Sequence, residues 1–248
     1  MLKADAALAR TIAQEAAALL RDLRAGGDCD GGVLGARGDR EANELILARL
    51  HAARPGDFIL SEESTDDPAR CGARRVWIVD PLDGTRSYCD ASPDYAVHIG
   101  LAVDGVPSAG AVALPASDRI FSSDQPPAPP PPHGGRPRIA VSDSRRPRIA
   151  ETVAQALGAE LVPMGSAGVK AMAVLLGNAD IYLHAGGQYQ WDNCAPAAVA
   201  LAAGLHASRI DGAPLVYNCA DPLLPDLLIC RPEWAAPVLA AVVAAGQG

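Results

Sequence analysis

The strongest constraint in this sequence is a short apolar run, residues 76–79, that leads directly into the hexapeptide Asp-Pro-Leu-Asp-Gly-Thr at positions 80–85. Its β-branched and aromatic residues predict a buried strand. Pro81 holds Asp80 in an extended conformation and fixes its own φ, so the chain turns at the end of the strand. The carboxylates of Asp80 and Asp83 can then converge, with the Leu82 carbonyl between them. Oxygen atoms arranged in this way are the ligands that a hard cation such as Mg²⁺ prefers.

The hexapeptide also has a simpler interpretation, because Pro-x-Asp-Gly is a common turn sequence and Asp83 can cap a following helix. Two further acidic segments favour a metal site. Glu62 follows a second predicted strand, and Asp192 precedes a predicted helix. Strand ends and helix starts are the places where α/β proteins bind ligands. Together with Asp80, these carboxylates in one cleft would repel one another unless a metal ion lay between them.

Hydrophobic periodicity divides the chain into a helical start, a strand-rich middle and an alternating second half. Amphipathic helices are predicted at 5–24 and 40–51, and Asp39 can cap the second. Strands are predicted at 58–60, 76–79, 95–103 and 110–114. In the second half, strands at 138–142, 161–164 and 179–183 alternate with helices at 149–157, 168–176 and 195–203. This alternation indicates an α/β arrangement.

A proline- and glycine-rich segment, residues 125–137, marks the predicted domain boundary. Its composition excludes regular structure and is typical of a loop or linker, with a polyproline ligand for a partner as the alternative. We therefore expect an N-terminal α+β domain at 1–124 with most of the metal ligands. A C-terminal α/β domain at 138–248 would contribute Asp192 and the substrate contacts.

The balance of charge excludes some partners. The 248 residues include 21 Lys and Arg against 29 Asp and Glu, and only 4% of them are aromatic. An acidic chain with few stacking side chains is a poor match for polymeric nucleic acid. Neither an apolar leader nor a membrane-length apolar window is present, so we expect a cytoplasmic location without membrane association. The dispersed cysteines are expected to be buried free thiols.

Taken together, the motifs resemble the inositol monophosphatase superfamily of Mg²⁺-dependent, lithium-sensitive phosphatases. The likeness rests on Glu62-Glu63, on Trp-Ile-Val-Asp-Pro-Leu-Asp-Gly-Thr at 77–85 and on Trp191-Asp192 before an Ala-rich helix. Within the superfamily, the sequence is most similar to the actinobacterial CysQ-type 3′-phosphoadenosine 5′-phosphate phosphatases, through segments at 35–43, 54–57, 60–63, 165–172 and 184–188. The resemblance implies a layered α/β/α/β/α sandwich whose two domains meet at the metal site.

The resemblance also implies ligand sets for two or three Mg²⁺ ions. Glu62, Asp80 and the Leu82 carbonyl would hold one ion, while Asp80, Asp83 and Asp192 would hold a second.

Catalytic roles follow from the same resemblance. Thr85, through a hydrogen bond shared with Asp39, would orient and help to deprotonate the attacking water. A helix cap is the alternative role for Asp39, and a simple cap hydroxyl is the alternative for Thr85. The amides of Gly84 and Thr85 would bind phosphate oxygens if they open a helix.

Substrate preference depends on less specific residues. Where inositol-specific relatives place an acidic residue, this chain has His184, which disfavours inositol and would meet a second phosphate or act as a structural hydrogen-bonding residue. Ser166 and Lys170 lie where nucleotidase relatives contact the nucleotide, although Lys170 can also be a solvated helix lysine.

The implied reaction removes the 3′-phosphate of 3′-phosphoadenosine 5′-phosphate, and of its sulfated analogue as a further candidate, to give AMP and phosphate in sulfur assimilation. Inositol monophosphatase or fructose-1,6-bisphosphatase activity is the alternative, and a non-enzymatic metabolite-binding or interaction protein is a third hypothesis. A homodimer is the expected assembly if the chain oligomerises.

Overall fold

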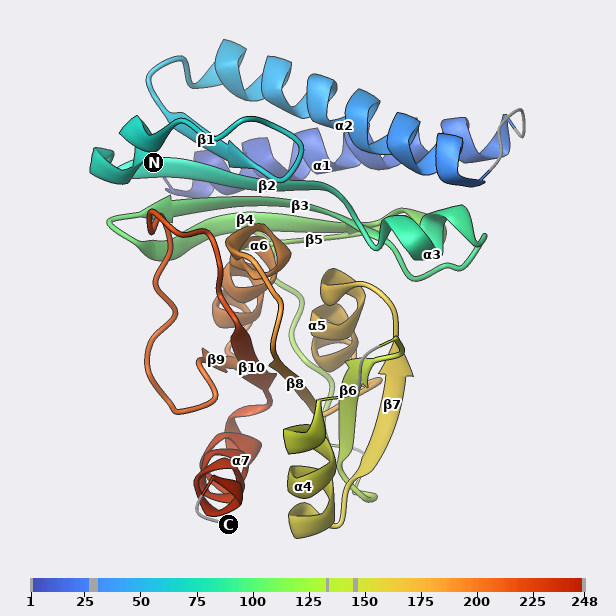
Figure 1. The fold of residues 1–248 in the computed structure, drawn as a ribbon, viewed down its shortest axis with the longest axis vertical. Helices are drawn as coiled ribbons and strands as arrows, with labels where there is room; N and C mark the ends of the chain where they lie inside the picture. The colour runs from blue at the N-terminus through green and yellow to red at the C-terminus, as the bar shows by residue number, and fades with distance from the viewer. Residues whose placement is uncertain (1, 27–30, 133, 145–146, 247–248) are drawn as a thin grey trace.

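The computed structural model describes residues 2–26, 31–132, 134–144 and 147–246. The described elements stack in alternating layers of helices and sheets (Figure 1). Helices α1 (Leu2–Ala25) and α2 (Gly31–Ala53) cover the outer face of the first sheet, and α4 (Arg148–Leu157) and α7 (Pro232–Ala245) cover that of the second. Helices α5 (Ala167–Leu175) and α6 (Gln190–Ala202) lie between the two sheets. The predicted α/β/α/β/α sandwich is confirmed.

The first sheet has the strand order β1-β2-β3-β4-β5. Its members are β1 (Phe58–Ser61), β2 (Arg75–Asp83), β3 (Ala96–Val103), β4 (Val106–Leu114) and β5 (Arg119–Ser122). Strand β1 runs parallel to β2, and the other pairs are antiparallel. Because β1 and β2 are parallel, their carboxyl ends meet at one edge, which brings the residues after Ser61 next to the acidic end of β2.

The second sheet has the order β7-β6-β8-β10-β9. Its members are β6 (Arg138–Ser142), β7 (Glu160–Met164), β8 (Ile181–Ala185), β10 (Asp226–Cys230) and β9 (His206–Ser208). The first three pair in parallel, as the predicted alternation of strands and helices requires, whereas β10 is antiparallel to both of its neighbours. The sequence reasoning missed β5, β9, β10 and helix α7.

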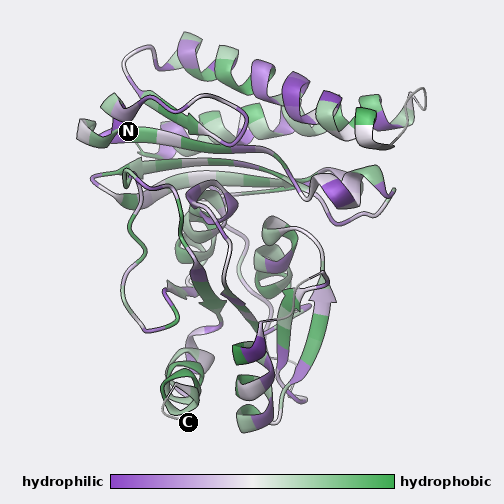
Figure 2. Ribbon diagram, in the orientation of Figure 1, coloured by the Kyte–Doolittle hydropathy of each residue, from purple (hydrophilic) through white to green (hydrophobic). Residues whose placement is uncertain are grey.

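Apolar side chains of β2 alternate between two cores. Trp77 and Val79 pack with α1 and α2, while Val76 and Ile78 face α5 and α6. The central strands are accordingly coloured hydrophobic along most of their length (Figure 2). Because the side-chain period of a strand is two residues, Asp80 continues the face of Ile78 and points toward the helices between the sheets.

Small residues let α6 approach the first sheet closely. A Cβ atom added to Gly100 would lie 2.8 Å from Sγ of Cys194, and one added to Gly110 would lie 3.1 Å from Cα of Ala195. The close approach brings the first turn of α6, which carries Asp192, to the edge of the sheet where β2 ends.

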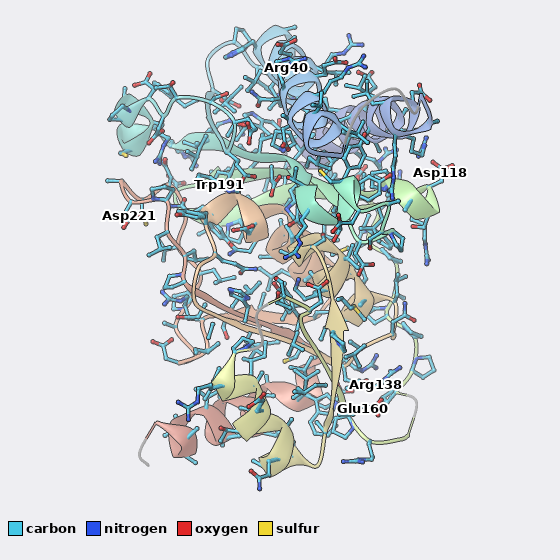
Figure 3. The ribbon with its side chains drawn as sticks, turned by 45° about the vertical axis from the view of Figure 1, so that its right-hand side comes forward. Arg40, Asp118, Arg138, Glu160, Trp191 and Asp221 are labelled. Atoms are coloured by element: carbon cyan, nitrogen blue, oxygen red, sulfur yellow. The ribbon has the colours of Figure 1, made fainter. Side chains whose placement is uncertain are left out.

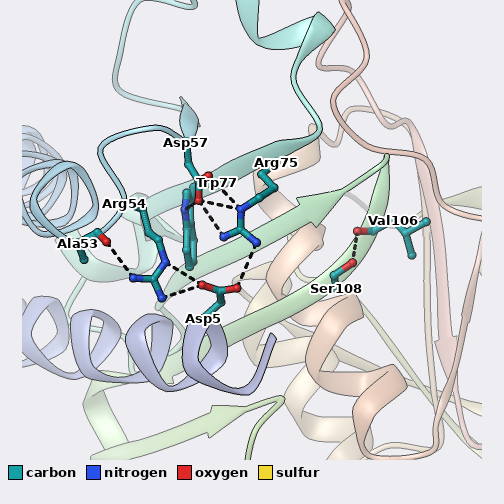
Figure 4. A network of polar contacts seen from close by, with 8 residues as sticks. All are labelled: Asp5, Ala53, Arg54, Asp57, Arg75, Trp77, Val106 and Ser108. Atoms are coloured by element: carbon teal, nitrogen blue, oxygen red, sulfur yellow. Dashed lines mark hydrogen bonds and ion pairs between the residues drawn. The ribbon is translucent and has the colours of Figure 1, made fainter. Parts of the chain in front are cut away.

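A buried ion-pair network fastens α1 to the beginning of β2 (Figure 4). Asp5, with none of its surface exposed, lies 2.8 Å from the guanidinium of Arg54 and 3.2 Å from that of Arg75. Arg75 also contacts Asp57 at 2.9 Å, and the indole of Trp77 donates to Asp57 at 3.0 Å. Every carboxylate of this network therefore has an arginine partner.

The second helix differs from the prediction. It begins at Gly31 rather than near position 40, so Asp39 lies inside α2 and its interpretation as a helix cap is wrong. The glycines of this stretch argue against a helix by propensity, but packing outweighs that preference. A Cβ atom on Gly35 would lie 2.6 Å from Sγ of Cys89, and one on Gly38 would lie 3.1 Å from Leu82.

Other local expectations also need correction. Helix α6 begins at Gln190 rather than at Ala195, so Asp192 belongs to its first turn. Cys71 and Cys219 are exposed free thiols rather than buried ones, and Cys29 lies outside the described residues. The described part of 125–137 holds no helix or strand, as predicted, whereas the division into domains there stays a prediction. Among the described residues, no helix has the length and apolar character to span a membrane.

Candidate metal centre

Three carboxylates from distant parts of the sequence meet where β2 ends and α6 begins. Asp80, Asp83 and Asp192 each offer an oxygen, and these atoms lie within 4.8 Å of one another. Asp80 and Asp83 are buried, and Asp192 is half-buried. The structure thus brings together three of the predicted metal ligands.

The end of β2 is shaped by its irregular pairing with β3. Asp80 lies opposite His98 and Asp83 lies opposite Ala96, with a register shift between the two pairs. The amide of Leu82 donates to Oδ1 of Asp80 at 3.0 Å, which closes a tight turn around Pro81. Because of this turn, both carboxylates face the same side, as the hexapeptide predicts.

The first turn of α6 presents Asp192. Its Oδ2 accepts a hydrogen bond from the backbone amide of Tyr189 at 2.6 Å, part of a reciprocal cap of the helix start. Trp191, which Figure 3 labels at this helix start below the first sheet, stacks on Tyr189 with ring centroids 4.8 Å apart. Asp192 therefore caps the start of α6 with one carboxylate oxygen and also belongs to the acidic cluster.

Glu62 lies at the solvent side of the cluster, directly after β1. Its amide donates to the carbonyl of Val79 at 3.2 Å, and its side chain lies within reach of the Asp80 carboxylate. The residue is exposed, but its carboxylate is partly withdrawn from water. That burial and the charges of Glu63, Asp83 and Asp39 raise its pKa to about 7.

Burial, followed by mutual repulsion, determines the pKa values of most carboxylates in the cluster. Burial and the charges of Glu62, Asp83 and Asp192 raise the pKa of Asp80 well above its ordinary value. Burial and the charge of Asp83 raise the pKa of Asp192 to about 7. Close carboxylates in a low-dielectric site cannot all ionise unless a cation accompanies them. These oxygen donors therefore fit a hard divalent cation, which would relieve the repulsion.

Asp83 is the exception because positive groups surround it. Burial alone would raise its pKa, but the charges of His98 and Lys170 and a hydrogen bond from Ser166 hold the pKa well below its ordinary value. Its Oδ2 accepts from the Ser166 hydroxyl and, at 2.8 Å, from the amide of Gly168. Asp83 is thus the member of the cluster that stays ionised most readily.

Thr85 and Asp39 lie beside the carboxylates. The Thr85 hydroxyl is 3.0 Å from the Leu82 carbonyl and 3.4 Å from Oδ1 of Asp39, so the predicted contact between Thr85 and Asp39 is present. Burial and the charge of Glu63 raise the pKa of Asp39 to about 7. A carboxylate with a pKa near neutrality is suited to accept a proton.

Of the predicted substrate contacts, Gly84 and Ser166 line a common cavity of about 380 Å³, and the Ser166 hydroxyl also donates to Asp83. Gly84 precedes the short helix α3 (Thr85–Cys89) with φ of 87°, and a Cβ there would lie 2.7 Å from the Asp94 carbonyl oxygen. Only glycine fits this position. The rest of the lining is mostly polar: Arg86, Ser87, Asp90, Ser92, Ser142, Asp143, Ser144 and Gly165.

Lys170 and His184 are turned toward backbone carbonyls. Nζ of Lys170 donates to the carbonyl of Ser166 at 2.5 Å, and the side chain is nearly buried rather than solvated, which corrects that alternative. Nε2 of His184 lies 2.9 Å from the carbonyl of Gly186. Both geometries are compatible with a structural role, and their substrate contacts stay predictions.

The sequence reasoning missed His98 and Gly168, which both contact Asp83. A signal for His98 was present, because it is an ionisable residue in an otherwise apolar strand, 96–103. There was no comparable indication for Gly168 in the sequence, because its role depends on His98, which packs against it only in the folded chain.

Comparison with known proteins identifies the family of the chain. The model of the inositol monophosphatase family matches residues 1–126 and 136–246. The chain therefore belongs to the inositol monophosphatase family.

Within the family, the chain is similar to several individual phosphatases and nucleotidases. The chain is 50% identical to the 3′-phosphoadenosine 5′-phosphate phosphatase of Mycobacterium leprae over 96% of its own length and 93% of that protein's. It is 32% identical to the 3′(2′),5′-bisphosphate nucleotidase CysQ of Escherichia coli over 73% of its length and 78% of that protein's. The crystal structure of CysQ from Bacteroides thetaiotaomicron superposes with a TM-score of 0.82 at 25% identity, covering 92% of this chain and 97% of the other.

Proposed function

We propose that this chain is a Mg²⁺-dependent phosphatase that hydrolyses the 3′-phosphate of 3′-phosphoadenosine 5′-phosphate to give AMP and phosphate. The observation that carries the proposal is the 50% identity, over almost the whole chain, to a phosphatase of that name. The carboxylates of Asp80, Asp83 and Asp192, gathered within 4.8 Å, support metal-dependent chemistry. By analogy, the reaction belongs to sulfur assimilation, and the sulfated analogue is a further candidate substrate.

The residues around the cluster have distinct roles in the proposed reaction. Glu62, Asp80, the Leu82 carbonyl, Asp83 and Asp192 would hold two or three Mg²⁺ ions. When bound, Mg²⁺ supplies positive charge that stabilises the phosphoryl oxygens in the transition state. Thr85 would orient the attacking water with its hydroxyl, which lies within 3.4 Å of Asp39. Asp39 would take up the proton, since its pKa of about 7 matches neutral conditions.

The polar cavity beside Asp83 is the proposed place for the nucleotide. Its volume of about 380 Å³ lies within the range of small-molecule sites, about 300–1,000 Å³. Gly84 and Ser166 line it next to the carboxylates, and Arg86 adds a positive charge for a second phosphate. Lys170 would hold the Ser166 carbonyl in place through its hydrogen bond. The positive charge of Lys170 also lies close to Asp83. The cytoplasmic location and the homodimer stay predictions.

A substrate panel tests the proposal. Purified enzyme with Mg²⁺ is expected to show kcat/KM for 3′-phosphoadenosine 5′-phosphate at least about tenfold above those for inositol 1-phosphate and fructose 1,6-bisphosphate. An enzyme that prefers either sugar phosphate would replace the nucleotidase assignment with the alternative. Asp192→Asn is the matched control, because loss of this ligand should remove activity toward every substrate. A panel without any phosphate release would instead favour a binding protein.

A further inference from the structure

His98 is a fully buried imidazole between the two segments that carry the metal-binding carboxylates. It lies on β3, directly opposite Asp80 in the antiparallel ladder. Its Nδ1 is 3.2 Å from the carbonyl oxygen of Trp191, and its Nε2 is 3.3 Å from Oδ2 of Asp83. One side chain thus contacts both the end of β2 and the residue before Asp192.

The two contacts set the orientation of the ring. Because the carbonyl of Trp191 can only accept a hydrogen bond, Nδ1 of His98 must donate to it. This bond turns the opposite ring nitrogen toward Asp83. On the carboxylate, the contacts from His98, Ser166 and Gly168 all fall on Oδ2, which directs Oδ1 away from them.

Helix α5 leaves room for the imidazole. A Cβ atom at Gly168 would lie only 2.2 Å from Nε2 of His98 and 2.9 Å from Cβ of Ala96. Since real atoms do not approach this closely, His98 can occupy its place only because position 168 has no side chain. His98 is therefore held by β2, α5 and α6 together.

We propose that His98 is a positioning residue of the metal centre. It fixes the Asp83 carboxylate relative to the segment Trp191-Asp192, so that carboxylates from β2 and α6 already stand at ligand distance before a cation binds. The proposal rests on the metal-dependent function proposed above, but it concerns the geometry of this chain's own residues. Mutation of a residue that hydrogen-bonds to a metal ligand commonly weakens metal affinity by about 10- to 100-fold.

The first test measures Mg²⁺ binding without substrate. His98→Leu removes both polar contacts at similar size, and calorimetric titration of metal-free protein is expected to show Mg²⁺ affinity at least about tenfold weaker. His206→Leu is the control, because His206 contacts Ser208 on β9 rather than the cluster, and its affinity should equal that of the wild type. Affinity within twofold of the wild type in folded His98→Leu overturns the proposal. Since no phosphate ester is present, this result is independent of the substrate assignment.

The second test uses the collision with Gly168. Gly168→Ala is expected to weaken Mg²⁺ binding several-fold in the wild-type background and much less in a His98→Ser background, where the ring is absent. An equal loss in both backgrounds would show that the methyl group acts through other contacts, which contradicts the proposal. His98→Asn provides the affinity measurement if His98→Leu does not fold. It keeps one amide donor, so a several-fold loss is expected, and wild-type affinity again counts against His98.

Discussion

Two groups of aspartates, one near each end of β2, have opposite electrostatic surroundings. At the start of the strand, Asp5 and Asp57 face Arg54 and Arg75 (Figure 4). At its end, the described carboxylates of Asp80, Asp83 and Asp192 face one another, and the nearby positive groups lower the pKa of Asp83. Burial of an unpaired carboxylate is costly. One end is therefore neutralised by arginines of the chain itself, whereas the carboxylates at the other end fit a cation.

The pKa values follow the same division. Burial tends to raise the pKa of Asp57, but hydrogen bonds from Arg75 and Trp77 and the arginine charges lower it overall. Burial and neighbouring carboxylates raise the pKa of Asp80 and Asp192. The acids at the start of β2 are thus compensated by arginines, whereas Asp80 and Asp192 have no arginine partner among the described residues.

The largest expected effect comes from removing a charge at the acidic end. Asp80→Asn should lower kcat/KM by more than about a thousandfold, because a catalytic metal contributes several kcal/mol and each 1.36 kcal/mol is tenfold in rate. The metal-free variant should melt at the same or a higher temperature, since repulsion is relieved. Steady-state kinetics and thermal melting in EDTA check both parts. Activity within tenfold of the wild type would remove Asp80 from the metal site.

Breaking the arginine-paired end should affect stability instead. Asp5→Asn leaves Arg54 and Arg75 without their buried partner and should lower the free energy of unfolding by about 3 kcal/mol, as measured in urea. At temperatures where the variant is folded, its kcat with Mg²⁺ should match that of the wild type. A loss below about 1 kcal/mol would mean that the network adds little to stability.

The stability of the metal-free protein should depend on pH because of the carboxylates at the acidic end. Glu62 and Asp192 have pKa values raised to about 7, so the folded chain binds more protons than the unfolded chain between roughly pH 4 and pH 7. The stability associated with these groups is therefore present below about pH 4 and declines as the pH rises through 7. Melting in EDTA should fall in temperature from pH 5 to pH 8.

Mg²⁺ should counteract this loss of stability at high pH, because metal ligands must be deprotonated. The increase in melting temperature that Mg²⁺ produces should be larger at pH 8 than at pH 5, and smaller at every pH in Asp80→Asn. An increase that is independent of pH would contradict the assignment of these carboxylates as ligands.

The smallest effect is expected from the neighbour of Arg75. Arg74 contacts Asp104 at 3.0 Å, with 76% and 62% of the two side chains exposed. Arg74→Ala should change the free energy of unfolding by less than about 1 kcal/mol, because exposed ion pairs contribute little. Arg75→Ala, which removes a partner of buried Asp5, should cost several times more in the same urea titration. Equal losses would show that burial is not what distinguishes the two arginines.

Much of the centre could be predicted from the sequence because its signals are local. Apolar runs followed by acids identify the strands before Glu62 and Asp80, and Pro81 forces a turn whatever surrounds it. The start of α2 could not be predicted, since Gly35 and Gly38 are unfavourable for a helix until Cys89 and Leu82 pack against them.

By itself, the sequence determined most of the elements, the α/β class and the chemical character of the carboxylates, because backbone propensity and ligand preference belong to short segments. Only the tertiary structure decided which carboxylates stay unpaired. It placed arginines at one end of β2, His98 beside Asp83, and Gly168 where the imidazole needs space. The physical reason is that pKa, repulsion and steric fit depend on distances between residues far apart in the chain, and folding alone sets those distances.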